Sequence, residues 1–318
     1  MVEIVEILHY GSIALVVGLN AISVGIGEGY VGGAAIEATS IQPESKNEIS
    51  RLAILGLALV ETAAIIGISM ALILFMGTTT QEDKTIYLGF AELGIALAIS
   101  LSGLAIGIVS AWPAMGACDA IARQPFTSNK ILRFMLITQS MIQTPIIFSF
   151  IIAMLIRNQA GSVDTIAESI RMIASGLCVG LGSIGPAIGL AKFGKTACSS
   201  LGVNKNSYNQ LFSFTLISEA IIETPIIFAL VIGLFLITLS APTLLKSIAM
   251  LGAAFCIGLG TLGPGIGSGR SSSEACKQIA KNPEIYSYLS KVSMFAQGMI
   301  DTAAVYAFLI SLSLILFV

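Results

Sequence analysis

The sequence predicts an all-α membrane protein of four tandem transmembrane helical hairpins, eight helices in total, that assemble into a double-layered ring. Three observations predict this fold: an apolar composition, eight long apolar segments and a fourfold internal repeat. Of the 318 residues, 55% are hydrophobic and only 11% are charged, and the mean hydropathy is +0.92. Soluble domains carry about a quarter charged residues, so this composition indicates that lipid is the solvent.

Eight apolar segments are long enough to cross a bilayer as helices, which takes roughly 20 residues each. They cover residues 8–40, 48–77, 86–120, 129–156, 169–200, 208–240, 245–278 and 288–318. Strand-like alternation is missing and glycine is abundant, with 32 residues. Helices are therefore expected rather than a transmembrane β-barrel.

A short motif recurs four times, as LVETAAII, MIQTPIIF, IIETPIIF and MIDTAAVY. Its key polar residues are Glu61, Gln143, Glu223 and Asp301, spaced 82, 80 and 78 residues apart. A turn segment begins 20 residues before each of them, and a threonine follows each. This register predicts four hairpins, over residues 1–80, 81–160, 161–240 and 241–318.

The first helix of each hairpin is rich in small residues, as in Gly25-Ile26-Gly27-Glu28-Gly29. In lipid, small residues let helix backbones approach closely. We therefore expect the first helices to form an inner ring and the bulkier second helices an outer ring. One chain cannot bury all of these faces, so several copies are expected to close the ring.

The charges predict an orientation. The net charge is −2, which argues against a nucleic acid partner. Twelve of the 16 Lys and Arg residues flank the first, third, fifth and seventh turns, whereas Lys84, Arg157, Arg171 and Lys246 lie on the opposite side. The positive-inside rule then places the four basic turns in the cytoplasm and both termini on the other side.

The four polar residues of the repeat are expected deep in the membrane, roughly 20–25 Å from the turns at 1.5 Å per residue. In a hairpin, two residues equally far from the turn lie opposite each other at the same depth. This reflection through the turn pairs Glu61 with Glu28, Gln143 with Ser110, Glu223 with Leu190 and Asp301 with Ser268. An ionised, unpaired carboxylate at this depth costs at least about 2.5–3.5 kcal/mol. Three such acids at equivalent positions predict loading sites that hold either a proton or a sodium ion bound by oxygen ligands.

The hairpins resemble the rotor-ring proteolipid, or c-subunit, of F-type ATP synthases. The segments GIGEGYVGGAAIEATSIQPESKNEI, LALVETA, ACDAIARQP, GPGIGSG and AKNP carry the resemblance, which extends over the whole chain as four copies. It implies a non-catalytic rotor component of the membrane sector that carries ions on Glu61, Glu223 and Asp301. It also implies contact with the stator a-subunit, with membrane lipids and, through Arg123, Gln124 and Pro125, with the central stalk. A bacterial inner (plasma) membrane is the expected location.

Two departures from the family are informative. Gln143 replaces the carboxylate in the second hairpin, and because an amide does not ionise, we expect that hairpin to carry no ion. Most members of the family are single hairpins, so the fusion also resembles V-type proteolipids.

Sodium and proton both remain candidates for the transported ion, and no other cofactor is expected. Features typical of sodium-binding rings are the threonines after the key positions and the polar partners nearby. They are Thr62, Thr224, Thr302, Glu28, Ser268 and Glu219. The oxygen atoms of these side chains favour sodium slightly over a proton, with Glu61, Glu223 and Asp301 as its ligands. Against sodium, threonines in membrane helices commonly just bond to the carbonyl group of the preceding turn.

Two other functions are compatible with the sequence. A V-type-like ATP-driven ion pump would use the same ring with fewer ions per hairpin. A secondary ion transporter of eight helices would require one central site and differentiated repeats. Four similar sites spread along the chain argue against the second.

Overall fold

The computed structural model describes residues 2–77 and 85–318, and these residues fold into helices joined by short turns. Lys84, one of the four basic residues expected on the terminal side, lies outside the described residues. Eight helical spans are long and apolar enough to cross a membrane, which confirms the predicted class and the eight helices. They run over Ile4–Ile41, Pro43–Met76, Ile86–Arg123, Pro125–Ser162, Ile166–Leu201, Tyr208–Thr238, Leu244–Lys281 and Pro283–Phe317.

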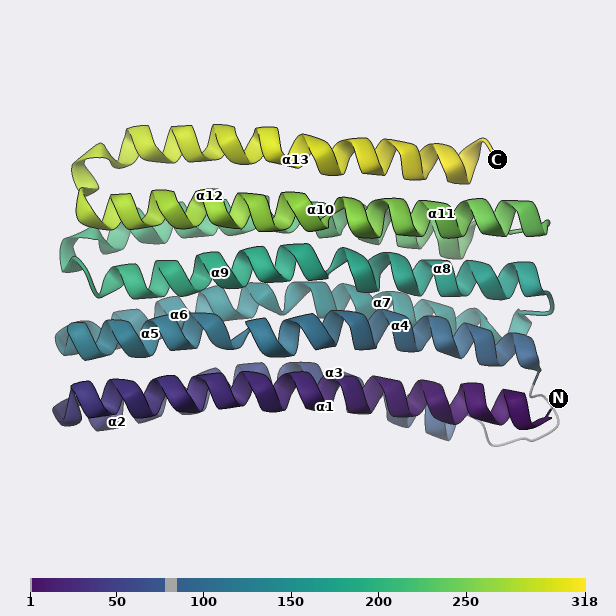
Figure 1. Cartoon of the computed structure of the whole chain (residues 1–318), viewed down its shortest axis with the longest axis horizontal. Helices are drawn as coiled ribbons and strands as arrows, with labels where there is room; N and C mark the ends of the chain where they lie inside the picture. The colour runs from purple at the N-terminus through teal and green to yellow at the C-terminus, as the bar shows by residue number, and fades with distance from the viewer. Residues whose placement is uncertain (1, 78–84) are drawn as a thin grey trace.

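The first helix of each hairpin lies in one layer. This layer contains α1 (Val2–Ile41), α4 (Ile86–Val109) with α5 (Ala111–Arg123), α8 (Ile166–Gly182) with α9 (Ile184–Leu201), and α11 (Leu244–Gly260) with α12 (Leu262–Lys281). Figure 1 shows these helices side by side in front, in chain order. Hairpins that follow each other in the sequence are therefore neighbours in space.

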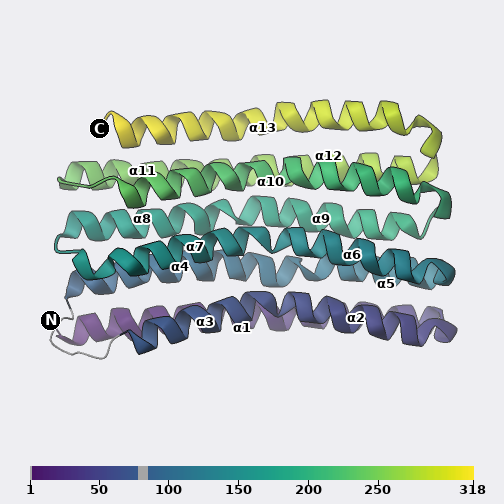
Figure 2. The ribbon, with the colours of Figure 1, turned by 180° about the vertical axis from the view of Figure 1, so that it is seen from behind.

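The second helix of each hairpin lies in the other layer. It contains α2 (Lys46–Val60) with α3 (Thr62–Met76), α6 (Ser128–Ile142) with α7 (Thr144–Gln159), α10 (Tyr208–Thr238) and α13 (Tyr286–Leu316). These helices are in front when the molecule is seen from behind (Figure 2). The two layers correspond to the predicted inner and outer helices of a double-layered assembly.

The four turns that carry the basic residues lie at one end of the molecule, and both termini lie at the other (Figure 1). Each basic turn contains a short 3-10 helix, namely η1 (Pro43–Ser45), η3 (Pro125–Thr127), η5 (Lys205–Ser207) and η6 (Pro283–Ile285); η4 (Ala160–Ser162) lies at the opposite end. Proline opens three of them. In the third turn Asn204 replaces the missing proline by accepting a hydrogen bond from the Asn206 amide at 3.0 Å.

Glycine lets the helices of the inner layer meet backbone to backbone. A Cβ atom added to Gly189 would collide with the Gly265 carbonyl oxygen of the next hairpin, and one added to Gly176 would collide with the Gly94 carbonyl oxygen. No side chain fits at either contact. The glycine pattern therefore sets the spacing of the inner layer, as the small residues predicted.

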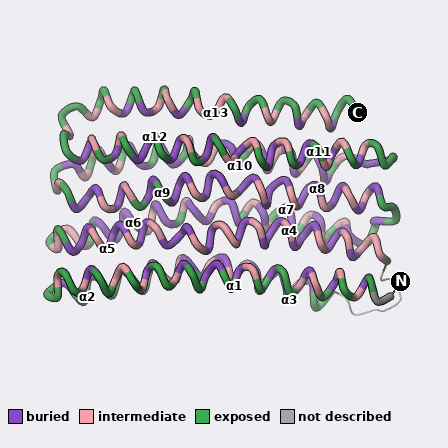
Figure 3. The backbone as a smooth tube through the Cα atoms, in the orientation of Figure 1, coloured by how far each residue is buried: buried purple, intermediate pink, exposed green. Residues whose placement is uncertain are grey.

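Burial is greatest in the middle of the chain and falls toward the first and fourth hairpins (Figure 3). In the most apolar window of the span Ile166–Leu201, 72% of the residues are buried, against 22% in Pro283–Phe317. The fourth hairpin thus exposes large apolar side chains such as Phe295 and Tyr306. Such surfaces are suited to lipid or to another copy of the protein.

Two buried basic side chains lie near the terminal end of the bundle. His9 Nδ1 lies 2.8 Å from Glu92 Oε2, which joins α1 to α4 with both side chains buried. Arg171 donates from Nη1 to the carbonyl oxygens of Ile237 and Leu239, at 2.5 and 3.1 Å, at the C-terminal end of α10. These contacts tie helices together away from the midplane.

Candidate ion-binding site

The four key polar residues all lie on second helices, in the outer layer. Glu61 lies between α2 and α3, Gln143 between α6 and α7, Glu223 within α10 and Asp301 within α13. Backbone hydrogen bonding continues through the first junction, because the Glu61 amide bonds to the Leu57 carbonyl at 3.1 Å. The side chains are therefore held on rigid helices.

In the first hairpin, the carboxyl groups of Glu28 and Glu61 lie side by side. Glu28 is half-buried and Glu61 is exposed at the open edge of the chain. Two ionised carboxyl groups this close repel each other, so a proton or a cation between them stabilises the pair. The contact matches the expected reflection of Glu61 onto Glu28.

In the fourth hairpin, Ser268 Oγ donates to Asp301 Oδ1 at 3.3 Å. Ser268 is fully buried on α12, and Asp301 is half-buried. This contact also joins the two residues that reflection through the turn pairs. It places a hydroxyl and a carboxylate oxygen side by side between the layers.

In the third hairpin, the carboxyl group of Glu223 lies beside the Thr144 hydroxyl of the second hairpin. Leu190, its expected first-helix partner, offers no polar side-chain atom. Glu219 lies one turn away, fully buried, and neither of its carboxyl oxygens has a hydrogen-bond partner among the described residues. This site therefore draws its oxygen atoms from two hairpins.

The second hairpin uses its amide differently. Gln143 Nε2 donates to the Leu59 carbonyl oxygen of the first hairpin at 3.0 Å. Ser110, the expected partner of Gln143, instead donates to the Gly107 carbonyl oxygen of its own helix at 3.5 Å. The polar contact at this level thus crosses to the preceding hairpin rather than to the first helix of the same one.

The threonines beside the key residues bond mainly to their own helices. Thr224 Oγ1 donates to the Ala220 carbonyl at 3.2 Å, and Thr302 Oγ1 donates to the Met299 carbonyl at 2.7 Å. Thr62 begins α3 directly after Glu61. A hydroxyl that donates to its own helix keeps its lone pairs free to accept a hydrogen bond or to bind a cation.

Two prolines remove backbone donors at this level. Pro145 and Pro225 follow the key positions by two residues and have no N–H, so they cannot bond to the carbonyl groups of Met141 and Ile221. Both carbonyl groups lie two residues before a key position, as Leu59 does in the first hairpin. The Met141 carbonyl accepts instead from the Gln143 backbone N–H.

A second polar level, not predicted from the sequence, lies one turn closer to the basic turns. Gln139 Nε2 donates to the Gly56 carbonyl at 2.8 Å, and Gln297 Nε2 lies 3.4 Å from Ser218 Oγ. Both bonds join a hairpin to the preceding one. Glu219 occupies the equivalent position, so aligning the repeats four residues before each key residue would have revealed this level.

The second turn presents the residues expected to contact a stalk. Arg123 is exposed and forms an ion pair with Asp119 at 2.9 Å, while Gln124 and Pro125 are half-buried. Phe126, which was not among the residues expected from the sequence, is fully exposed. An apolar ring is thus exposed at the tip of a basic turn.

Comparison with known proteins agrees with this architecture. The family model that describes the C subunit of ATP synthase matches residues 12–74, 93–156, 173–236 and 251–314, which together cover more than half of the chain. Each match contains one key polar residue and one pair of layered helices.

Single relatives match one hairpin at a time. The ATP synthase c-subunit 2 of Cereibacter sphaeroides is 39% identical over 74 residues, which is 23% of this chain and 89% of the relative. The ATP synthase c-subunit of Dehalococcoides mccartyi is 39% identical over 71 residues, 22% of this chain and 93% of the relative. The ATP synthase c-subunit of Thermotoga maritima is 34% identical over 68 residues, which is 21% of this chain and 80% of the relative. The chain therefore belongs to the family of ATP synthase c-subunits, as a fused form that joins four of the family's hairpins in one polypeptide.

Proposed function

We propose that this rotor proteolipid carries cations on Glu61, Glu223 and Asp301 as its ring turns against a stator a-subunit. The observation that carries the proposal is the equivalent placement of three carboxyl groups on second helices within apolar spans. A carboxylate that accepts a cation becomes neutral and can pass through lipid, whereas an ionised one cannot do so cheaply. The chain itself contributes no catalysis, and rotation couples transport to the ATPase head.

Sodium is the ion that the surrounding oxygen atoms favour. Hard cations prefer oxygen ligands, and the sites offer carboxylate, hydroxyl and backbone carbonyl oxygens. At Glu223 these are the Thr144 hydroxyl and the carbonyl oxygen of Ile221, which lacks its usual helical donor because residue 225 is proline. A proton needs only one acceptor, so this set of oxygens would be superfluous in a proton ring.

Orientation and stalk contact follow from the charge at the turns. With the four basic turns in the cytoplasm, Arg123, Gln124, Pro125 and the exposed Phe126 face the central stalk. The termini then lie on the opposite side of a bacterial inner membrane. Lipids cover the apolar outer face.

Carbodiimide labelling tests this proposal. Dicyclohexylcarbodiimide reacts with protonated membrane carboxyl groups, so peptide mass spectrometry should find adducts on Glu61, Glu223 and Asp301. Sodium, but not potassium at the same ionic strength, should slow the labelling. Labelling that sodium leaves unchanged across a range of pH would contradict sodium as the ion, and unmodified carboxyl groups would contradict the site itself.

Gln143 also supports a second candidate, an ATP-driven pump. A ring with three acids in four hairpins moves fewer ions per turn, so each ATP supplies more free energy per ion. This ratio suits export against a steep gradient. ATP-dependent sodium uptake into inverted vesicles, measured together with ATP synthesis in the same vesicles, distinguishes the two directions.

A further inference from the structure

One position of the inner layer changes its charge along the chain: it is acidic in the first two hairpins, neutral in the third and basic in the fourth. Near the basic turns, the residues at this position are Glu37, Asp119, Ser199 and Lys277, spaced 82, 80 and 78 residues apart. Inside the chain, Ser199 Oγ donates to Asp119 Oδ2 at 2.9 Å. Residues at this position can therefore contact each other between neighbouring hairpins.

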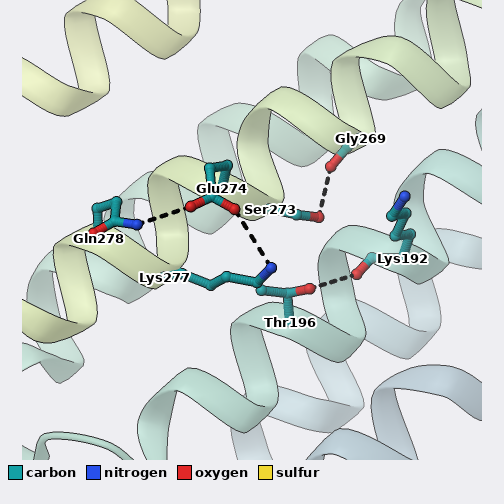
Figure 4. A network of polar contacts seen from close by, with 7 residues as sticks. All are labelled: Lys192, Thr196, Gly269, Ser273, Glu274, Lys277 and Gln278. Atoms are coloured by element: carbon teal, nitrogen blue, oxygen red, sulfur yellow. Dashed lines mark hydrogen bonds and ion pairs between the residues drawn. The ribbon is translucent and has the colours of Figure 1, made fainter.

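The fourth hairpin has an excess of positive charge at this position. Lys277 and Lys281 lie one turn apart on α12, where the second hairpin has Asp119 paired with Arg123 at 2.9 Å. Lys277 reaches Glu274 at 3.4 Å while its side chain stays about half exposed (Figure 4). Glu274 is shared with Gln278, whose Nε2 donates to it at 2.8 Å. Lys277 thus has only part of one acid as its partner on α12.

The first hairpin has the complementary charge. Glu37 is exposed near the turn end of α1, and the described residues provide it with no ion pair. It lines a pocket of about 230 Å³ together with Asp119 and Lys195, and no ion pair joins it to that lysine.

Glycine residues on α12 and α1 show how neighbouring hairpins pack and where a neighbour is missing. Gly265 and Gly269 approach the third hairpin so closely that added Cβ atoms would collide with the backbone of Pro186 and Gly189. Gly25 and Gly29 occupy the same repeat positions on α1 and have nothing within 4 Å of an added Cβ. The face of α1 that would meet a preceding hairpin is therefore built for close packing but has no neighbour within the chain.

We propose that α12 of one copy packs against α1 of the next copy, and that Lys277 forms an ion pair with Glu37 across this seam. The contact repeats the packing that the chain already makes between its own hairpins, with Lys277 and Glu37 in the places of Asp119 and Ser199. It also fixes the order of the copies, since an α1–α1 seam would bring two acids together and an α12–α12 seam two pairs of lysines. The inference rests on the proposed rotor assembly.

A cysteine pair tests the seam in the assembled ring. Disulfides require Cα atoms about 4.4–6.8 Å apart. The double variant Glu37→Cys with Lys277→Cys should therefore give, after mild oxidation, a covalent ladder of 33.1 kDa chains on a denaturing gel. The matched control pairs Glu37→Cys with Lys192→Cys, an exposed residue on α9 inside the chain, and should give no ladder. The native cysteines are the same in both variants.

The seam and the rotor assembly can fail separately in this experiment. An intact ring without the ladder overturns the seam but leaves the rotor assembly. Wild-type protein that never forms a ring overturns both.

Charge reversal gives an independent measurement. Lys277→Glu should lower the fraction of ring that survives detergent by about two- to fivefold per seam, the range for partly exposed ion pairs. Adding Glu37→Lys should restore it, and high salt should diminish the difference. Failure of the double variant to recover, while Lys192→Glu alone behaves like the wild type, would overturn the ion pair.

Discussion

The side-chain amide of Gln143 donates to the backbone carbonyl of Leu59 at 3.0 Å, across the boundary between the first two hairpins. The amide N–H supplies to this oxygen the positive partial charge that a bound cation would supply at an acidic site. The Gln143 Nε2 group therefore has its hydrogen bond without an ion, whereas Gln143 Oε1 is buried and has no hydrogen-bond partner among the described residues. Under the proposed function the second hairpin passes the stator as a permanently neutral station.

Gln143→Glu should create a fourth loading site in each chain. The new carboxylate would face the Leu59 carbonyl and lose the donor that now satisfies it, so it needs a proton or a cation. The ion-to-ATP ratio should rise by about a third, from three to four ions per chain passage, because the number of ionisable key residues rises from three to four. Simultaneous measurement of ion flux and ATP turnover in proteoliposomes checks this ratio.

Gln143→Met is the matched control for this substitution. It removes the same hydrogen bond but adds no acid, so the ratio should stay at its wild-type value. An unchanged ratio for Gln143→Glu, in an intact ring that carbodiimide labels at residue 143, contradicts the silent second hairpin.

Thr144→Val should weaken sodium binding at Glu223 and leave Asp301 unaffected. The substitution keeps the shape of the side chain and removes the hydroxyl that lies beside the Glu223 carboxyl group, within reach to bond to it. Hydrogen bonds to charged groups contribute about 1.5–3 kcal/mol, so protection of Glu223 by sodium should require about ten- to a hundredfold more sodium. Labelling rates of the two acids, read from the same digests, provide the comparison.

Thr238→Val serves as the control for Thr144→Val. Thr238 Oγ1 bonds to the Leu234 carbonyl at 2.9 Å, far along α10 from the key position. Its replacement makes the same chemical change without touching Glu223. Equal loss of protection in both variants would show a general effect on the helices and refute the cross-hairpin site.

Gly189→Ala should destabilise the bundle, because its methyl group would collide with the Gly265 backbone. Overpacking of this kind costs about 1–3 kcal/mol. Gly252→Ala, where the nearest atom to an added Cβ is Leu314 Cδ1 at 3.9 Å, should be neutral or slightly stabilising. Thermal unfolding in one detergent compares the two variants, and a Gly189→Ala protein as stable as the wild type would contradict the close inner packing.

Much of the fold was predictable because lipid requires long apolar helices and because the repeat has a fixed register. The turn positions also predicted the Glu28–Glu61 and Ser268–Asp301 contacts, since residues equidistant from a turn lie at one depth. Contacts between hairpins were not predictable in this way. Thr144 reaches Glu223 through packing of separate helices, which spacing within one hairpin does not describe.

The same limit applies to the contacts of the second hairpin. Reflection placed Ser110 opposite Gln143, but the Ser110 hydroxyl bonds to its own helix and Gln143 turns toward the first hairpin. The depth of a residue in the membrane does not determine the direction in which its side chain points around the helix axis. The repeat alignment shows polar residues at 139, 219 and 297, but the bonds of Gln139 and Gln297 to the preceding hairpins depend on how the helices pack.

Native mass spectrometry of the carbodiimide-treated, detergent-solubilised ring is the decisive measurement for a fused, ion-carrying rotor. A ring of several fused chains should have a protein mass that is a whole multiple of 33.1 kDa, so its number of hairpins is a multiple of four. Each chain should carry three adducts, one for each of Glu61, Glu223 and Asp301. A functional monomer, or a closed ring whose chains carry no adduct at these residues, would contradict the proposed rotor.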